Sequence, residues 1–196
     1  MPVNLPILLT WLRIILIPLF VGMFYFPESL VSIPYQNLTA TVIFTVAALT
    51  DWFDGWLART LNQTSAFGAF LDPVADKLMV TAALLVLLKV ERVDAWIVLI
   101  IIGREITVSA LREWMAKIGS SKSVAVSFLG KVKTAAQMVA IPMLLYNDRI
   151  GDFDPQFVGT LLIWIAAILT ILSMMYYLKA AIPLVLKGGE PPGGQP

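Results

Sequence analysis

The chain has 196 residues, of which 59% are hydrophobic and 14% are charged, whereas soluble domains average about 45–50% and about 25%. This composition is typical of an integral membrane protein. The net charge of +1, from 14 basic and 13 acidic residues, lacks the basic excess expected of a nucleic-acid-binding protein. The absence of cysteine and histidine excludes disulfides, thiol nucleophiles, Cys/His zinc sites and a histidine general base. Chemistry here would use carboxylates, Lys, Arg, hydroxyls or oxygen-liganded metals.

Six charge-free stretches predict six transmembrane helices in an all-α, polytopic membrane protein. They cover residues 14–27, 29–50, 78–88, 95–103, 134–147 and 155–178. In the second stretch, Pro, Gln and Asn over 34–37 indicate a turn, so its helical part is expected nearer 38–50. Only the last stretch is a plain apolar span, and the others need polar residues to cross about 30 Å of hydrocarbon. We expect one membrane domain over 1–187 and a disordered Gly/Pro-rich tail over 188–196.

Each of the first five stretches is bounded by a charged residue, and alternating spans place all five at one side of the membrane. These residues are Arg13, Asp51, Lys77, Arg104 and Lys133. Charges within a membrane are costly unless paired, metal-bound or hydrated, so they indicate a shared polar cavity. Eleven of the 14 Lys and Arg residues fall on this same side. The positive-inside rule therefore predicts that the cavity and both termini face the cytoplasm.

Four aspartates at helical spacing form the most informative motif. Asp51 and Asp54 stand at i and i+3, and Asp72 and Asp76 at i and i+4, so each pair shares a helical face. The short polar connection between the two segments predicts antiparallel neighbours whose carboxylates converge. Their repulsion would be relieved by two divalent cations, and all-oxygen ligation suits Mg²⁺ or Mn²⁺.

Small and basic residues accompany the aspartates. Gly55 and Ala58 share the face of Asp51 and leave room for a flat group, while Arg59 offers a fork for phosphate. Together with two metal ions, this pattern predicts a nucleotide diphosphate site. A structural alternative exists for a single aspartate: Asp72 before a proline is also typical of a helix start.

The whole segment resembles the signature of the CDP-alcohol phosphotransferases, a family of six-helix, usually dimeric membrane enzymes. Every fixed position of that signature is matched, by Asp51, Asp54, Gly55, Ala58, Arg59, Gly68, Asp72 and Asp76. The resemblance implies transfer of a phosphatidyl group from a CDP-linked lipid to an alcohol, with release of CMP.

The same resemblance assigns roles to individual residues. It implies that the four aspartates hold two metal ions and that Asp76 is the general base. It also implies that CDP is bound by Asp51, Asp54, Gly55, Ala58, Arg59, Gly68 and Asp72. A single displacement of this kind needs no enzyme nucleophile.

Three further segments, over 4–18, 103–116 and 130–138, resemble a bacterial branch of the family that uses CDP-diacylglycerol and sn-glycerol 3-phosphate. This implies a homodimer in the bacterial inner membrane, surrounded by membrane lipids. In the first segment, Thr10 and Arg13 are expected to support the site, whereas Ile7 replaces an asparagine found in many relatives.

A phosphorylated acceptor requires its own cationic pocket. Arg104 and Arg112 share a helical face, Lys131 and Lys133 open the next helix, and Glu105 could orient an arginine. The alternative is that these cations only enforce topology or touch anionic lipid headgroups.

Three other functions compete with this interpretation. Within the family, the acceptor could be inositol phosphate or a second lipid. A divalent-cation transporter or channel would use the carboxylates as a permeation site, but it predicts polar residues through to the outer face, where the six stretches are apolar. A purely structural membrane scaffold leaves the aspartates unexplained.

Overall fold

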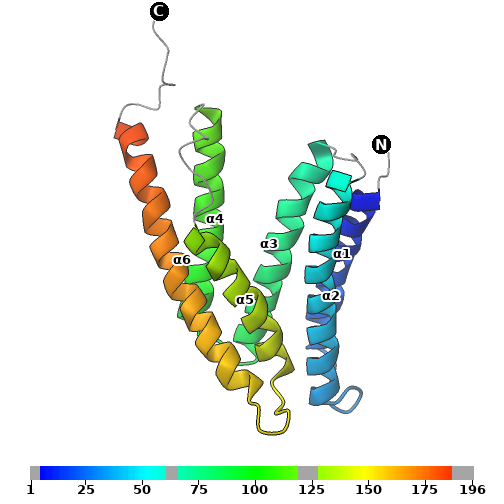
Figure 1. Cartoon of the computed structure of the whole chain (residues 1–196). Helices are drawn as coiled ribbons and strands as arrows, with labels where there is room; N and C mark the ends of the chain where they lie inside the picture. The colour runs from blue at the N-terminus through cyan, green and yellow to red at the C-terminus, as the bar shows by residue number, and fades with distance from the viewer. Residues whose placement is uncertain (1–4, 61–65, 119–127, 187–196) are drawn as a thin grey trace, which may run out of the picture. The chain divides into compact units, whose positions relative to one another are not determined.

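The computed structural model describes residues 5–60, 66–118 and 128–186, and these residues form six α-helices (Figure 1). Their bounds are α1 Leu5–Met23, α2 Ile33–Thr60, α3 Ala66–Lys89, α4 Ala95–Lys117, α5 Phe128–Tyr146 and α6 Pro155–Leu186. No strand is present in the described ranges, although Ile150 and Phe153 form an isolated bridge between α5 and α6. The all-α prediction is therefore confirmed. The predicted tail over 188–196 lies outside the described residues.

The helices extend well beyond the charge-free stretches, and one predicted boundary was wrong. The second helix begins at Ile33 rather than near residue 38. Proline is compatible with a first helical turn because its missing N–H has no partner there in any case. The buried Gln36 side chain also donates to the carbonyls of Phe26 (3.1 Å) and Val31 (2.8 Å) and so ties the preceding loop to the helix.

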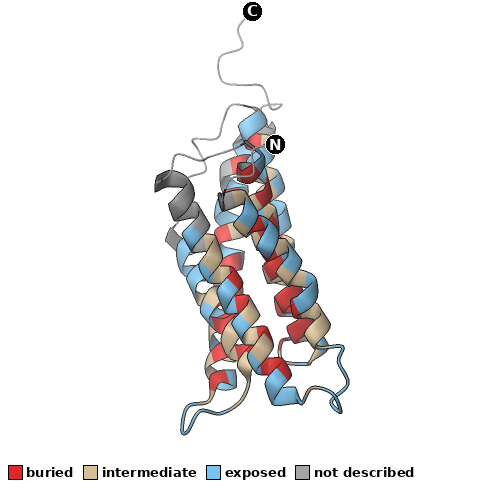
Figure 2. Ribbon diagram, turned by 90° about the vertical axis from the view of Figure 1, so that its right-hand side faces the viewer, coloured by how far each residue is buried: buried red, intermediate tan, exposed pale blue. Residues whose placement is uncertain are grey.

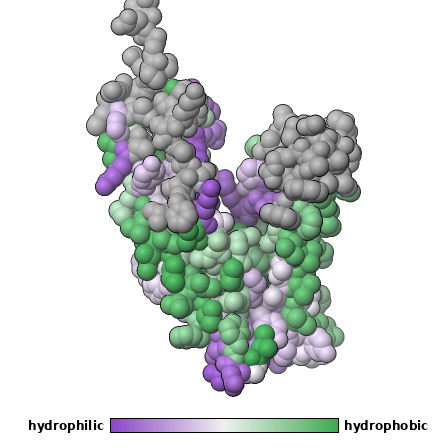
Figure 3. All heavy atoms as spheres, viewed as in Figure 1, coloured by the Kyte–Doolittle hydropathy of each residue, from purple (hydrophilic) through white to green (hydrophobic). Residues whose placement is uncertain are grey.

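The exposed surface of the helices is strongly apolar. Large hydrophobic side chains lie exposed on every helix, including Leu19, Val42, Leu85, Leu99, Val139 and Ile168. Figure 2 shows exposed and buried residues alternating around each helix, and Figure 3 shows hydrophobic residues over much of the helix sides. Within the described residues, one stretch, Pro155–Pro183, is both long and apolar enough to cross a membrane, while Ile7–Met23 is a shorter apolar helix. An apolar surface of this extent indicates a lipid or protein environment rather than water.

The chain divides into two compact units, which are described separately. The first comprises Met1–Asp94 and Met138–Thr160, and the second Ala95–Gln137 and Leu161–Pro196.

In the first unit, α1 packs against both α2 and α3. Phe20 of α1 and Phe44 of α2 are fully buried, with ring centroids 6.5 Å apart. Small residues at the contacts, such as Ala40, Ala75 and Ala83, are also completely buried. Small side chains allow the close helix approach typical of membrane proteins.

In the second unit, α6 presents a buried stripe of mostly small residues at helical spacing, namely Ala166, Ala167, Thr170, Ser173, Tyr177 and Ala181. The buried side chains of α4 are largely apolar, with Ile101, Val108 and Met115 at most 2% exposed. Arg104, on the same helix, is a buried exception. The polar residues among these buried positions therefore need partners within the unit.

Candidate active site

Three helices of the first unit bring two of the predicted carboxylates to one cation. Arg13 of α1 is 1% exposed, and its Nη1 atom lies 3.1 Å from Oδ1 of Asp51 at the C-terminal part of α2. The same nitrogen pairs with Oδ1 of Asp76 on α3. Because both carboxylates reach one atom, they converge as the antiparallel arrangement predicted. The two side chains remain 40% and 42% exposed, so solvent or a ligand can reach them.

A third carboxylate is oriented by the same face of α1. The buried hydroxyl of Thr10, one turn before Arg13, donates to Oδ1 of Asp72 at 2.5 Å. Since α3 begins at Ala66, Asp72 lies inside the helix, so the alternative that it marks a helix start was wrong. Thr10 and Arg13 therefore supply a neutral and a charged donor to the carboxylates of the neighbouring helices.

The described residues fit a hard divalent cation by their chemistry, but they do not form a complete site. Asp51, Asp72 and Asp76 offer only oxygen donors, as Mg²⁺ and Mn²⁺ prefer. In the described part of the chain, no group of three or more acidic side chains is close enough to hold a metal ion. The predicted fourth ligand lies outside the described side chains, together with three predicted CDP contacts: Asp54, Gly55, Ala58 and Arg59. Gly68 is described and is buried on α3.

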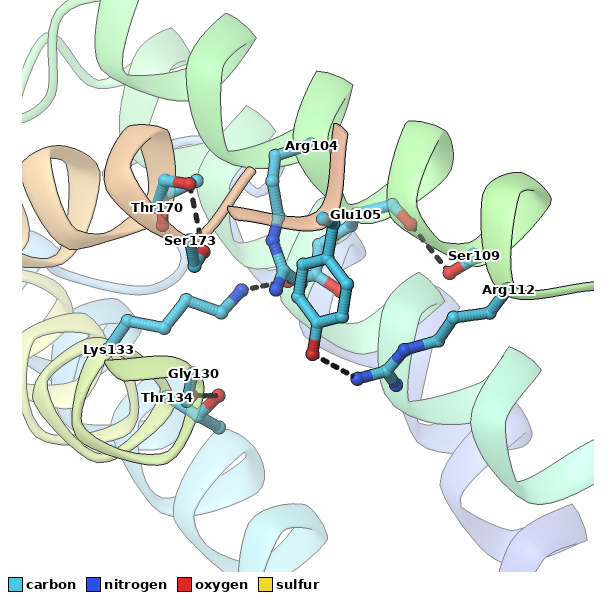
Figure 4. Close-up of polar contacts among 10 residues, drawn as sticks. Arg104, Glu105, Ser109, Arg112, Gly130, Lys133, Thr134, Thr170 and Ser173 are labelled. Carbon is cyan, nitrogen blue, oxygen red and sulfur yellow. Dashed lines mark hydrogen bonds and ion pairs between the residues drawn. The ribbon is translucent and has the colours of Figure 1, made fainter. Parts of the chain in front are cut away.

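The second unit contains a cluster of cations around one carboxylate (Figure 4). Lys133 of α5 is 3% exposed and its ammonium pairs with Oε1 of Glu105 on α4. The neighbouring Arg104 is 7% exposed and its Nη1 donates to the same Oε1 at 3.2 Å. Glu105 therefore bridges two buried cations, whereas the sequence predicted only that it could orient an arginine.

Tyr177 of α6 joins the two predicted arginines and was missed by the sequence analysis. Its hydroxyl accepts a hydrogen bond from Nη2 of Arg112 at 2.5 Å. The guanidinium carbons of Arg104 and Arg112 lie 5.6 and 5.0 Å from the centroid of its ring, which is within cation–π range. No sequence signal separates Tyr177 from Tyr176 in an apolar run, because only the packing decides which tyrosine turns inward. We call Arg104, Glu105, Arg112, Lys133 and Tyr177 the cation cluster.

The two predicted lysines of α5 are separated. The sequence grouped both lysines in one pocket, but Lys133 is buried in the cation cluster while Lys131 is exposed, because residues two apart do not share a helical face. Among the described residues of this unit, two buried polar atoms lack a hydrogen-bond partner: Nε of Arg104 and Oγ1 of Thr170. Because unsatisfied buried groups are costly, an acceptor that reached these atoms would stabilise the unit.

Comparison with known proteins assigns the chain to a protein family. The sequence profile of the CDP-alcohol phosphatidyltransferase family matches residues 3–172. The chain belongs to this family. The family resemblance of the aspartate segment is thus confirmed, and the match includes both units.

Individual relatives in the CDP-alcohol phosphatidyltransferase family are similar over nearly their whole length. The chain is 51% identical over 185 residues to a protein of Shigella flexneri serotype 5b named CDP-diacylglycerol–glycerol-3-phosphate 3-phosphatidyltransferase. It is 50% identical to the protein of the same name in Escherichia coli strain K12. Each alignment covers 92% of this chain and 96% of the relative.

Proposed function

We propose that this protein transfers the phosphatidyl group of CDP-diacylglycerol to sn-glycerol 3-phosphate, giving phosphatidylglycerophosphate and CMP. The observation that carries the proposal is the 50–51% identity, over 92% of the chain, to relatives whose names specify this donor and acceptor. The two polar clusters support it, because the reaction needs carboxylates for a diphosphate–metal complex and a separate set of cations for an acceptor that is itself phosphorylated.

The first unit binds the donor in this proposal. Two divalent cations, Mg²⁺ or Mn²⁺, held by Asp51, Asp54, Asp72 and Asp76 would neutralise the diphosphate of CDP. Gly55, Ala58 and Gly68 leave space for the nucleotide, and Arg59 pairs with a phosphate oxygen. Arg13 and Thr10 keep Asp51, Asp72 and Asp76 oriented through the contacts described above.

The displacement proceeds in one step, with Asp76 as the general base. The acceptor hydroxyl gives its proton to the Asp76 carboxylate while its oxygen forms a bond to the phosphorus that carries the diacylglycerol. The bond from that phosphorus to the oxygen of CMP breaks, and the leaving phosphate is stabilised by Arg59. Arg13 keeps the carboxylate of Asp76 in position.

The second unit binds the phosphate of the acceptor. Arg104, Arg112 and Lys133 are grouped around Glu105 and Tyr177, and Lys131 contributes a more exposed charge that attracts the anion. The apolar exposed surface supports a lipid environment. We propose that the protein crosses a bacterial inner membrane six times and forms a homodimer. In this proposal the active site and both termini face the cytoplasm.

The test is release of CMP by the purified, detergent-solubilised protein supplied with CDP-diacylglycerol and Mg²⁺, with and without glycerol 3-phosphate. We expect release only when glycerol 3-phosphate is present, loss of release on chelation of the metal, and loss in Asp76→Asn. Asp152→Asn, in the exposed loop before α6, is the matched control and should remain active. Release only with inositol phosphate or a second lipid would reject the acceptor, and no release with any acceptor would reject the transferase assignment.

A further inference from the structure

Glu105 occupies an unusual place for an acidic residue in an anion-binding site. Glu105 is the acidic member of the cation cluster. One oxygen of its carboxylate contacts both Lys133 and Arg104. Its side chain is 26% exposed, while those of Lys133 and Arg104 are almost fully buried. The carboxylate therefore sits where a bound anion would compete for the same nitrogen atoms.

A phosphate monoester would meet the same donors. Near neutral pH it carries about −1.5 to −2 charges and three strong acceptor oxygens. The cluster offers the ammonium of Lys133, the guanidinium groups of Arg104 and Arg112, and the unpartnered, buried Nε of Arg104. The Tyr177 hydroxyl accepts from Arg112 and so holds that guanidinium in the cluster. An anion entering here would be attracted by three cations and repelled by Glu105.

We infer that Glu105 is an internal counter-ion that holds the cation cluster together when no acceptor is bound and limits how tightly the cluster holds a phosphate monoester. This inference rests on the proposed function, in which the cluster binds the phosphate of the acceptor. The product of that reaction still carries the same phosphate monoester, so a site that held it too tightly would release product slowly. The carboxylate weakens the hold on substrate and product alike.

The substitution Glu105→Gln isolates the charge. Glutamine has the same shape and keeps an oxygen that can accept from Lys133 and Arg104, but it removes the repulsion between a carboxylate and a bound phosphate. Inorganic phosphate is the probe, because it can be titrated without turnover. Binding is measured as the rise in unfolding temperature with phosphate concentration, since a ligand that binds the folded state stabilises it by mass action.

We expect phosphate to bind Glu105→Gln about tenfold or more tightly than the original protein. In turnover, the KM for glycerol 3-phosphate should fall, kcat should fall through slow product release, and the KM for CDP-diacylglycerol should stay unchanged. Glu105→Asp keeps the charge and should restore phosphate affinity to within about twofold. Glu113→Gln is the matched control, because Glu113 lies on the same helix in an exposed pair with Lys117, and it should change nothing.

Loss of the Glu105 carboxylate can also lower the stability of the folded protein when no phosphate is present. In that case Glu105→Gln should start from a lower unfolding temperature and gain more from phosphate than the original protein, because the anion replaces the missing carboxylate. Equal or weaker phosphate binding in Glu105→Gln would overturn the inference while CMP release still supports the proposed reaction.

The source of the anion is tested in parallel. Stabilisation of the original protein by micelles containing phosphatidylglycerol, but not by inorganic phosphate, would assign the cluster to a lipid headgroup and overturn the inference. The same result would remove the acceptor site from the proposed function, whereas the CMP-release assay tests the reaction itself independently.

Discussion

Nη1 of Arg13 lies 3.1 Å from Oδ1 of Asp51, and the same nitrogen pairs with Asp76 on the next helix. A charge on α1 therefore holds together two carboxylates that come from α2 and α3. Arg13 is almost fully buried, whereas both partners are partly open to solvent. Arg13 therefore joins α1 to the carboxylates that α2 and α3 contribute.

Arg13→Ala should reduce both stability and activity. It leaves two carboxylates facing each other without the cation and removes a buried side chain. Because the carboxylates are partly solvated, we expect a loss of roughly 1–3 kcal/mol in the free energy of unfolding and a fall in kcat of at least about tenfold. Thermal unfolding and CMP release measure the two effects. Arg149→Ala removes an exposed ion pair with Asp154 and should affect neither; an equal effect of both variants would argue against a special role for Arg13.

Thr10→Val should raise the Mg²⁺ concentration that the protein needs for CMP release. Valine has the shape of threonine but cannot donate to Asp72, which then loses a 2.5 Å hydrogen bond worth roughly 1–2 kcal/mol. We expect a severalfold increase in the Mg²⁺ concentration that gives half-maximal CMP release. Thr41→Val provides the control, because the Thr41 hydroxyl bonds to the carbonyl of Asn37 within its own helix. An unchanged Mg²⁺ requirement in Thr10→Val would contradict a positioning role.

Tyr177→Phe should raise the KM for glycerol 3-phosphate by about three- to tenfold, as expected for the loss of one hydrogen bond. The aromatic ring would still contact Arg104 and Arg112, but Arg112 would lose its acceptor. The KM for CDP-diacylglycerol should not change. Tyr176→Phe tests the neighbouring exposed tyrosine and should match the original protein. A change in both KM values would indicate a general packing defect instead.

Arg92→Met should destabilise the first unit without changing either KM. Arg92 donates to the carbonyls of Leu144 (3.1 Å) and Leu145 (2.7 Å) near the end of α5, and to Oδ1 of the buried Asn37 (2.8 Å). Burial lowers the pKa of Arg92 from its ordinary value, although nearby Asp148 opposes this. Charged hydrogen bonds of this kind predict a loss of roughly 2–4 kcal/mol, measured by thermal unfolding. A normal unfolding temperature would show that water replaces these contacts.

The contacts of Asp154 predict that the folded protein loses stability at acid pH. Its Oδ1 accepts from the backbone N–H of Phe157 at the start of α6 and its Oδ2 pairs with Arg149. The hydrogen bond from Phe157 is the main reason that the pKa of Asp154 lies below its ordinary value of 3.8. The stabilisation is therefore complete above the unfolded-state pKa, near 4, and is lost as pH falls through the lower folded-state pKa.

The substitution Asp154→Asn tests this cap directly. Asparagine also caps helices well but does not titrate, so the variant should resemble the original protein at pH 7. Between pH 5 and 3 the unfolding temperature of the original protein should fall more steeply than that of the variant. Parallel curves would show that this carboxylate does not contribute to the pH dependence.

Much of the architecture could be predicted from local pattern. Charge-free stretches located the cores of all the described helices, because burying charge in hydrocarbon is costly. The spacing of Asp72 and Asp76 and of Arg104 and Arg112 placed each pair on one face, since the helical repeat alone determines this. Boundaries were less accurate: the start of α2 depends on contacts of Gln36 with the preceding loop, which no periodicity encodes.

The amino-acid sequence by itself therefore indicated the class of protein, the candidate metal ligands and the candidate cations for an acceptor phosphate, because composition, helical spacing and the family signature are all local properties of the chain. Only the tertiary structure decided which groups meet. It paired Arg13 with Asp51 and Asp76, Thr10 with Asp72, and Glu105 with Lys133. It also turned Tyr177 rather than Tyr176 inward. The pairings join residues on different helices, and the inward turn of Tyr177 depends on its neighbours on other helices, so both follow from how the helices pack against one another rather than from spacing along the chain.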